Sequence, residues 1–169
     1  MRMNNNNSQI INHDDIKLIV YDFDGVMTDN KVIVDETGRE SVVVNRSDGY
    51  AIARIKDYGI SQIILSTEKN QVVRKRAEKL NIPVIHGVDD KKSILEKYCT
   101  DYNISLEKVL YIGNDLNDYD VMMSVGYPCC PADAEIEIQD VASWISTKKG
   151  GDGVIRELYR VLFGGLRNG

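Results

Sequence analysis

The sequence predicts an α/β fold in which helices cover both faces of a parallel β-sheet. Short apolar, β-branched runs recur along the chain, and the segments between them have helical periodicity. Strands that alternate with helices are typical of parallel sheets, because parallel neighbours need a crossover connection. The 169 residues are enough for one domain with a real core. We expect a polar, disordered lead over residues 1–14 and a single domain over residues 15–169.

The first strand is expected over residues 16–21, which contain neither glycine nor proline. It is followed at once by Asp22-Phe23-Asp24-Gly25. Side chains two residues apart on an extended segment point the same way, and the carboxyl ends of strands are where α/β sheets bind ligands. Paired carboxylates repel one another unless a cation or a shared proton compensates. The alternative is that the pair only caps a helix or lines a solvated turn.

A β-hairpin and a helix should come next. The hairpin is expected over residues 31–35 and 39–44, joined by the turn Glu36-Thr37-Gly38. Asp48 is the expected N-cap of the following helix, which carries Ala51, Ile52 and Ile55 at helical spacing and ends at Gly59.

The remaining elements continue the alternation. We expect strands at 60–65, 84–85, 109–112, within 127–134 and at 142–145, and helices at 69–80, 91–102 and 121–125. Trp144 is expected in the core. A last helix should follow Gly153 with five residues facing inward, namely Val154, Ile155, Leu158, Val161 and Leu162.

Composition excludes several classes of function. The net charge of −5 argues against nucleic acid or an anionic membrane as the main partner. No apolar run approaches the ~20 residues of a membrane span, and the polar start does not have the pattern of a secretory signal, so we expect a cytoplasmic protein. The three cysteines, Cys99, Cys129 and Cys130, are interpreted as small packing residues.

Four motifs of the chain, taken in order, resemble those of a known enzyme family. The run Asp22-Phe23-Asp24-Gly25-Val26-Met27-Thr28 resembles the first motif of the haloacid dehalogenase-like phosphatases, and a serine, a lysine and an acidic loop follow in the family's order. The resemblance implies a Rossmann-like fold and an aspartyl-phosphate on Asp22, with Asp24 as acid and base. It implies phosphate contacts from Ser66 and Lys91. Taken singly, Ser66 is typical of a helix cap and Lys91 of a solvated surface.

The resemblance also implies a magnesium site. Its ligands would be Asp22, Asp24 and Asn114, supported by Asp115 and Asp118 from the loop Gly113-Asn114-Asp115-Leu116-Asn117-Asp118. The family has aspartate where this chain has Asn114. An amide oxygen still coordinates Mg²⁺, but one negative charge is missing, so we expect an enzyme that is slower or needs more magnesium.

The similarity narrows to one branch without a cap domain. The segments that resemble this branch are 46–49, 86–91, 111–118, 131–134 and 150–157. This branch contains 3-deoxy-D-manno-octulosonate 8-phosphate phosphatase, the nonulosonate 9-phosphate phosphatases and the phosphatase-like domain of some acylneuraminate cytidylyltransferases. The hairpin stands where larger members insert a cap. What the branch implies is a homotetramer in which hairpins pack centrally and a neighbouring subunit roofs each site.

The expected substrate is a phosphorylated 2-keto-3-deoxy sugar acid. Octulosonate enzymes usually have Thr-Gly-Arg after the second strand, whereas Ser66-Thr67-Glu68 is similar to the nonulosonate 9-phosphate phosphatases. The octulosonate 8-phosphate is the alternative. The residues expected to contact the substrate are Thr67, Glu68, Arg76, Lys79 and Arg156. Eleven helical residues span about 16 Å, so we expect Lys79 to act on a neighbour's substrate; the alternative is an exposed basic helix face.

A function of another class stays open at this point. The chain could be a weakly active or inactive tetramerisation module associated with sugar-nucleotide synthesis. Asp22, Asp24, Ser66 and Lys91 are all present, and a purely structural role would not require all four. The sequence therefore favours an active enzyme.

Overall fold

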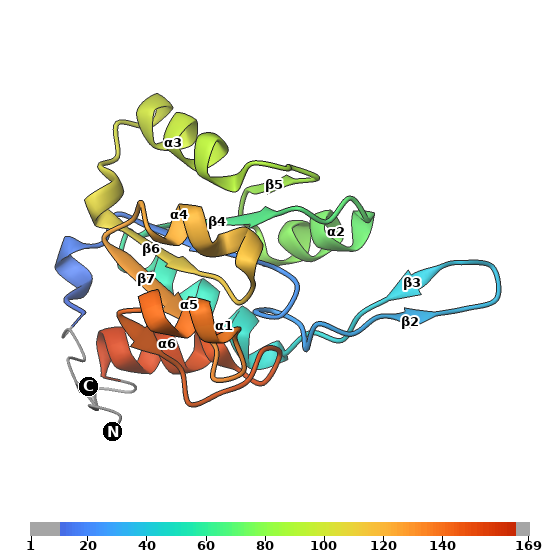
Figure 1. The fold of residues 1–169 in the computed structure, drawn as a ribbon. Helices are drawn as coiled ribbons and strands as arrows, with labels where there is room; N and C mark the ends of the chain where they lie inside the picture. The colour runs from blue at the N-terminus through green and yellow to red at the C-terminus, as the bar shows by residue number, and fades with distance from the viewer. Residues whose placement is uncertain (1–10, 165–169) are drawn as a thin grey trace, which may run out of the picture.

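A central parallel sheet organises the molecule in the computed structural model, which describes residues 11–164 (Figure 1). In spatial order its strands are β5 (Val84–His86), β4 (Ser61–Ser66), β1 (Leu18–Tyr21), β6 (Val109–Ile112), β7 (Tyr127–Cys130) and β8 (Trp144–Ile145). All five neighbouring pairs are parallel. The predicted α/β class is confirmed. β1 lies in the middle, and every one of its residues is buried, which explains its continuous apolar run.

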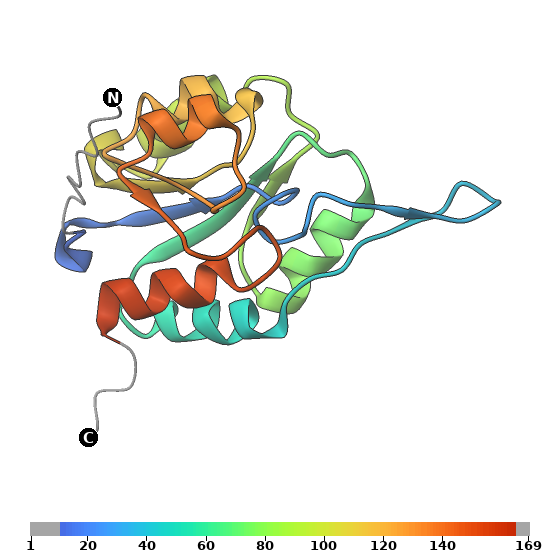
Figure 2. The same ribbon diagram turned by 60° about the horizontal axis from the view of Figure 1, so that its bottom comes forward.

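Helices cover both faces of this sheet (Figures 1 and 2). One face packs against α1 (Arg46–Lys56), α2 (Gln71–Leu80) and α6 (Val154–Phe163). The other packs against α3 (Lys91–Asp101), α4 (Tyr119–Met122) and α5 (Ile136–Val141). Each face has its own hydrophobic core, and alternate residues of β1 pack into one or the other. Ile19 and Tyr21 pack on the first face, and Leu18 and Val20 on the second. The three cysteines are buried, as predicted.

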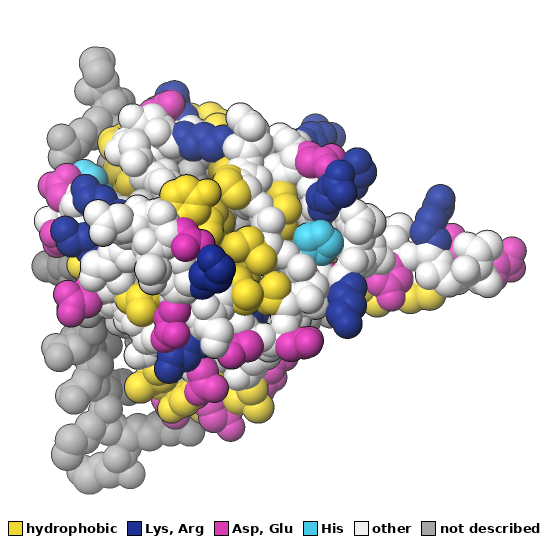
Figure 3. Space-filling view, turned by 90° about the horizontal axis from the view of Figure 1, so that it is seen from above, with side chains coloured by type: hydrophobic (Ala, Val, Ile, Leu, Met, Phe, Trp, Pro, Cys, Tyr) yellow, Lys and Arg dark blue, Asp and Glu magenta, His cyan; other side chains and the backbone are white. Residues whose placement is uncertain are grey.

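The hairpin of β2 (Ile33–Val34) and β3 (Glu40–Ser41) forms a separate arm (Figures 1 and 2). Its turn is closed by Gly38, which has φ 81° and donates its backbone N–H to the carbonyl oxygen of Asp35. Hydrophobic side chains lie exposed along one side of the arm (Figure 3), and Ile33 is 65% exposed. The predicted hairpin is confirmed, although its paired strands are only two residues long.

The start of α1 differs from the prediction. Asn45, not Asp48, is the N-cap, and its side-chain oxygen accepts from the backbone N–H of Ser47 at 2.9 Å. Asp48 is buried inside the first turn, where its Oδ1 accepts from the backbone N–H of Arg156 at 2.9 Å. Asp48 therefore bonds the first turn of α6, whose own N-cap, Gly153, offers no side chain.

Three other predictions need correction. Val161 is 45% exposed and faces away from the core. Trp144 is only partly buried at the core margin. Residues 1–10 of the predicted lead lie outside the described residues, but Ile11 is buried and a 3₁₀ turn, η1 (His13–Asp15), follows it.

Some short elements were not predicted, and one was displaced. The helix α5 and the 3₁₀ turns η2 (Leu106–Lys108) and η3 (Leu116–Asp118) have no clear periodicity. A short helix was predicted over residues 121–125; the observed α4 starts two residues earlier, directly after the 3₁₀ turn η3 (Leu116–Asp118).

Within the described residues 11–164, no helix is long and apolar enough to span a membrane.

Candidate active site

Polar side chains gather where the central strands end. Asp22 directly follows β1, Ser66 is the last residue of β4, and Asn114 lies two residues beyond β6. All three are buried, with exposed fractions of 5%, 1% and 8%. Because these strands are parallel neighbours, their carboxyl ends meet at one edge, as ligand sites in open α/β sheets do.

Lys91 lies at the centre of this edge. Its Nζ is 2.9 Å from Asp22 Oδ1 and 2.7 Å from Asp118 Oδ1, and the residue is only 2% exposed. Lys91 is the first residue of α3, and Asp90 is the N-cap that begins the helix there. Burying a charge is costly unless it is paired, so the two carboxylates stabilise this ammonium group. The interpretation of Lys91 as a solvated surface residue is wrong.

Asp118 fixes the loop that follows β6. Besides Lys91, its Oδ1 accepts the hydroxyl hydrogen of Tyr111 at 2.7 Å, and its Oδ2 accepts the backbone N–H of Asn114 at 2.9 Å. Asp118 is fully buried. Asp115 instead turns outward and caps η3, where it accepts from the backbone N–H of Leu116 at 2.6 Å.

The cluster perturbs the pKa values of its own members. Burial raises the pKa of Asp22 well above its usual range, the neighbouring Asp118 raises it further, and Lys91 offsets part of this effect. Burial alone would lower the pKa of Lys91, but Asp22 and Asp118 outweigh it and the pKa is raised. Two carboxyl groups share one ammonium group, so a further cation beside Asp22 would favour the ionised form of Asp22.

Asp24 differs from Asp22 in its surroundings. It is only half-buried. Burial raises its pKa, and the next contribution is the negative charge of Glu68. A carboxyl group with a raised pKa holds its proton more readily, which suits a proton donor. The pKa of Asp22 is raised as well, so the two carboxyl groups differ in their contacts: Asp22 is buried and paired with the Lys91 ammonium group at 2.9 Å, whereas Asp24 is more exposed.

Three oxygen positions converge beside this pair. One terminal atom of the Asn114 amide lies 3.1 Å from Asp22 Oδ2 and 2.8 Å from the backbone carbonyl oxygen of Asp24. Adjacent ligands of an octahedral Mg²⁺, each about 2.1 Å from the ion, are about 3 Å apart. The donor set therefore fits magnesium when the amide oxygen takes that position. Asp24 would contribute its carbonyl oxygen and not its carboxylate.

The described residues contain no second candidate metal site made of side chains alone. Among the described residues, no group of three or more His, Cys, Asp or Glu side chains could hold a metal.

Comparison with known protein families matches residues 5–158 to the haloacid dehalogenase-like hydrolases. The chain belongs to this family. The predicted family and its phosphatase class of enzyme are thereby confirmed.

Relatives and solved structures agree with this assignment. The 3-deoxy-D-manno-octulosonate 8-phosphate phosphatase of Yersinia pestis is 32% identical over 144 residues, which is 85% of this chain and 77% of that protein. A Streptomyces avermitilis protein described as a HAD family hydrolase is 43% identical, with a TM-score of 0.91 over 94% of this chain and 91% of that chain. The octulosonate 8-phosphate phosphatase of Moraxella catarrhalis, solved with magnesium, phosphate and KDO, is 29% identical, with a TM-score of 0.88 over 98% and 95% of the two chains.

Two of the residues expected to contact the substrate, Thr67 and Glu68, directly follow the end of β4. Glu68 comes close enough to Asp24 to raise its pKa, and Ser66 Oγ accepts from the backbone N–H of Glu68 at 3.1 Å. Thr67 Oγ1 accepts from the side-chain amide of Asn117 at 3.4 Å. The segment 66–68 thus lies between the first motif and the acidic loop.

The three expected basic residues lie elsewhere in the phosphatase. Arg76 donates to the backbone carbonyl oxygen of Asn45 at 3.0 Å and so joins α2 to the start of α1. Lys79 is exposed near the far end of α2. The Arg156 guanidinium lies 4.3 Å from the centre of the Tyr50 ring, in a hollow of about 510 Å³ beside α6. Their substrate contacts remain predictions.

A loop before α6 supports the first motif, and the sequence did not reveal this contact. The backbone N–H of Gly151 donates to the carbonyl oxygen of Val26 at 3.0 Å. A Cβ at Gly150 would lie 2.1 Å from the carbonyl oxygen of Gly25, so only glycine fits there. From the sequence alone, the glycine-rich segment 150–153 is interpreted as an anion-binding loop or a flexible linker at the start of a helix, and not as a support for the first motif.

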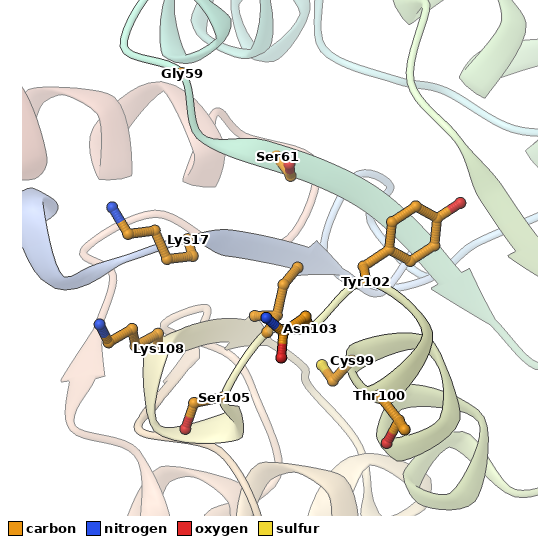
Figure 4. Close-up of a pocket in the computed structure, with 10 residues that line it drawn as sticks. Lys17, Gly59, Ser61, Cys99, Thr100, Tyr102, Asn103, Ser105 and Lys108 are labelled. Carbon is orange, nitrogen blue, oxygen red and sulfur yellow. The ribbon is translucent and has the colours of Figure 1, made fainter.

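A second hollow of the phosphatase lies at the opposite edge of the sheet (Figure 4). Its volume is about 770 Å³, and Lys17, Ser61 and Lys108, at the starts of β1, β4 and β6, contribute to its lining. No carboxylate lines it. The convergent charges, and not the size of a hollow, therefore place the candidate active site at the carboxyl edge.

Proposed function

We propose that the chain is a magnesium-dependent phosphomonoesterase that hydrolyses a phosphorylated 2-keto-3-deoxy sugar acid through an aspartyl-phosphate on Asp22. The observation that carries the proposal is the geometry around Asp22. One of its oxygens is 2.9 Å from the Lys91 ammonium group, and the other is 3.1 Å from the Asn114 amide, which itself lies 2.8 Å from the Asp24 carbonyl oxygen. A buried carboxylate held in this way is positioned to act as a nucleophile.

The reaction has two steps. In the first, an Asp22 oxygen attacks phosphorus, the bond from phosphorus to the sugar oxygen breaks, and Asp24 gives its proton to that oxygen. In the second, Asp24 takes a proton from water, the water oxygen attacks phosphorus, and the bond to Asp22 breaks to release inorganic phosphate. Ser66 and Lys91 bind the phosphoryl oxygens, and Lys91 also holds Asp22 in place.

Asp22 Oδ2, the carbonyl oxygen of Asp24 and Asn114 Oδ1 would hold the magnesium ion. When bound, the ion supplies positive charge that offsets the repulsion between the carboxylates and the incoming phosphate. Phosphate monoesters hydrolyse extremely slowly without a catalyst, so this offset is a large part of what the site must provide.

The substrate we favour is a nonulosonate 9-phosphate. Its support is the resemblance of Ser66-Thr67-Glu68 to enzymes of that type, together with the position of Glu68 beside Asp24, where its carboxylate can accept hydrogen bonds from sugar hydroxyls. The octulosonate 8-phosphate is the second candidate, because it is the substrate named for the curated relatives. Family membership alone does not choose between them.

Phosphate release from a panel of sugar phosphates with Mg²⁺ tests the proposal. We expect the highest kcat/KM for a nonulosonate 9-phosphate and no release by Asp22→Asn. A higher kcat/KM for octulosonate 8-phosphate would identify the second candidate. If the wild-type chain releases no more phosphate than buffer from either compound, the catalytic proposal is wrong and a structural module for sugar-nucleotide synthesis becomes the better account.

We also propose that the chain is a homotetramer assembled through its hairpins. The support is that Val32, Ile33, Val34 and Val43 are each more than half exposed on the β2–β3 arm, where burial against other copies would remove apolar surface from water. The measurement is the solution mass of the wild type against Ile33→Lys. A wild type that runs as a monomer contradicts the proposal.

Assembly would also allow Lys79 to reach a neighbour's substrate. A Lys79→Ala chain keeps Asp22, and an Asp22→Asn chain keeps Lys79, so mixed tetramers should recover activity that neither parent has. Absence of recovery, in mixtures shown by mass spectrometry to contain both chains, would contradict action in trans.

A further inference from the structure

The backbone of Asn114 is fixed by two hydrogen bonds, and its side-chain amide packs closely against Gly25. The Asn114 backbone N–H donates to Asp118 Oδ2 at 2.9 Å, and its carbonyl oxygen accepts from the backbone N–H of Glu135 at 2.9 Å. On another side the amide packs so tightly on Gly25 that a Cβ there would lie 2.0 Å from Nδ2. Rotation of the amide by 180° about its last bond exchanges oxygen and nitrogen with little change in shape.

The two rotamers present opposite chemistry to the first motif. With Oδ1 in the inner position, three oxygens face one another at 3.1 and 2.8 Å without a hydrogen between them. That arrangement is favourable only when a cation, or a proton on Asp22 Oδ2, lies between the oxygens. With Nδ2 in the same position, the amide donates one hydrogen bond to Asp22 Oδ2 and one to the Asp24 carbonyl oxygen, over the same two distances. That arrangement needs no cation.

An aspartate at this position has no such second state, because an ionised carboxylate only accepts hydrogen bonds. It would add a negative charge next to Asp22 and Asp118, for which Lys91 is the one partner within ion-pair distance among residues 11–164. Asparagine at position 114 therefore alters the charge and the hydrogen bonds of the site both without the metal and with it.

We propose that the Asn114 amide is a two-position switch. Without a divalent cation, Nδ2 turns inward, bonds Asp22 and Asp24 and closes the metal position; with the cation, the amide rotates and Oδ1 becomes a ligand. The inference takes the metal position from the proposed function and adds that magnesium must displace two hydrogen bonds. With the usual net strength of hydrogen bonds, this displacement lowers magnesium affinity about tenfold or more.

The first test observes the amide itself. In ¹⁵N-labelled full-length protein, the Asn114 side-chain NH₂ signal is identified by its absence in Asn114→Asp. We expect its protons to exchange slowly with water in EDTA and measurably faster, with a shifted ¹⁵N resonance, as Mg²⁺ is added. An NH₂ group that exchanges at the same rate in both conditions would overturn the switch.

The second test compares thermal unfolding in EDTA and in Mg²⁺. Asn114→Asp should unfold at a lower temperature than the wild type in EDTA and gain more from magnesium, with at least about tenfold tighter binding in titration. Asn117→Asp is the matched control, since it adds the same charge three residues away at an exposed position, and it should gain no more from magnesium than the wild type.

The outcomes separate the switch from the metal site. If magnesium raises the unfolding temperature of both proteins equally, the metal position stands and the switch is wrong. If magnesium raises neither, the metal position itself is wrong and the switch falls with it. Neither readout depends on phosphate release, so the choice of substrate in the proposed function does not affect the result.

Discussion

Asp118→Asn tests whether the buried cluster depends on one carboxylate. Asp118 accepts hydrogen bonds from Lys91 and Tyr111 on Oδ1 and from Asn114 on Oδ2. An asparagine has the same shape but only one acceptor oxygen, and its NH₂ group must face a donor in either orientation. The substitution therefore leaves at least one buried donor unpaired and removes one of the two charges that stabilise the Lys91 ammonium group.

The expected cost follows from these contacts. Removing one partner of a buried ion pair costs about 3–5 kcal/mol. Lys91 keeps Asp22 at 2.9 Å, so we expect the lower end, about 3 kcal/mol. For a domain of this size, each kcal/mol lowers the unfolding temperature by about 2–4 °C, which gives a decrease of about 6–12 °C.

The assay is urea unfolding followed by circular dichroism, with Asp120→Asn as the control. Asp120 is exposed and lies two residues away, so its substitution should change the free energy of unfolding by less than about 0.5 kcal/mol. If Asp118→Asn and Asp120→Asn are equally stable, Asp118 does not stabilise Lys91 in the way described and the reasoning is refuted.

Two further predictions concern pH. Burial makes the largest contribution to the raised pKa of Asp24, and the charge of Glu68 the next, so Glu68→Gln should lower that pKa and move the alkaline limb of the kcat/KM profile to lower pH. Glu40→Gln is the control, because the charge of Glu40 contributes less and should move the limb less. If the two variants have equal pH profiles, Asp24 is not the acid. Burial raises the pKa of Asp48 to about 6, so the folded state holds this proton more tightly than the unfolded state and loses stability as the pH rises from about 4 to 6. Asp48→Asn keeps an acceptor for the Arg156 N–H. Its free energy of unfolding, measured in urea, should exceed that of the wild type by about 3 kcal/mol at pH 7 and by almost nothing at pH 4. If the free energies of unfolding of the two proteins change in parallel with pH, Asp48 is not the titrating group.

Local patterns were sufficient for much of the fold. The apolar run over residues 16–21 predicts β1 because a strand buried on both faces needs no polar position. The turn Glu36-Thr37-Gly38 predicts the hairpin, since a glycine relieves the backbone at positive φ. Periodicity failed for α5, which is too short for its pattern to stand out.

The prediction that Asp48 is the N-cap of α1 was wrong for a related reason. An aspartate before an apolar helical pattern is a typical N-cap, but Asn45, three residues earlier, can also cap a helix. What decides is that the start of α6 packs beside α1 and needs an acceptor for the N–H of Arg156. That need arises between segments more than a hundred residues apart, so no local pattern records it.

The sequence by itself determined the class of fold, the family and the set of polar residues at the strand ends, because strand burial and motif order are properties of neighbouring residues. Only the tertiary structure decided that Lys91 pairs with both Asp22 and Asp118, that Asp24 turns its carbonyl oxygen toward Asn114, and that Gly150 packs on Gly25. These contacts depend on the strand order, with β1 between β4 and β6. The physical reason is that charge pairing and close packing act through space, over a few ångströms, between residues that are distant along the chain.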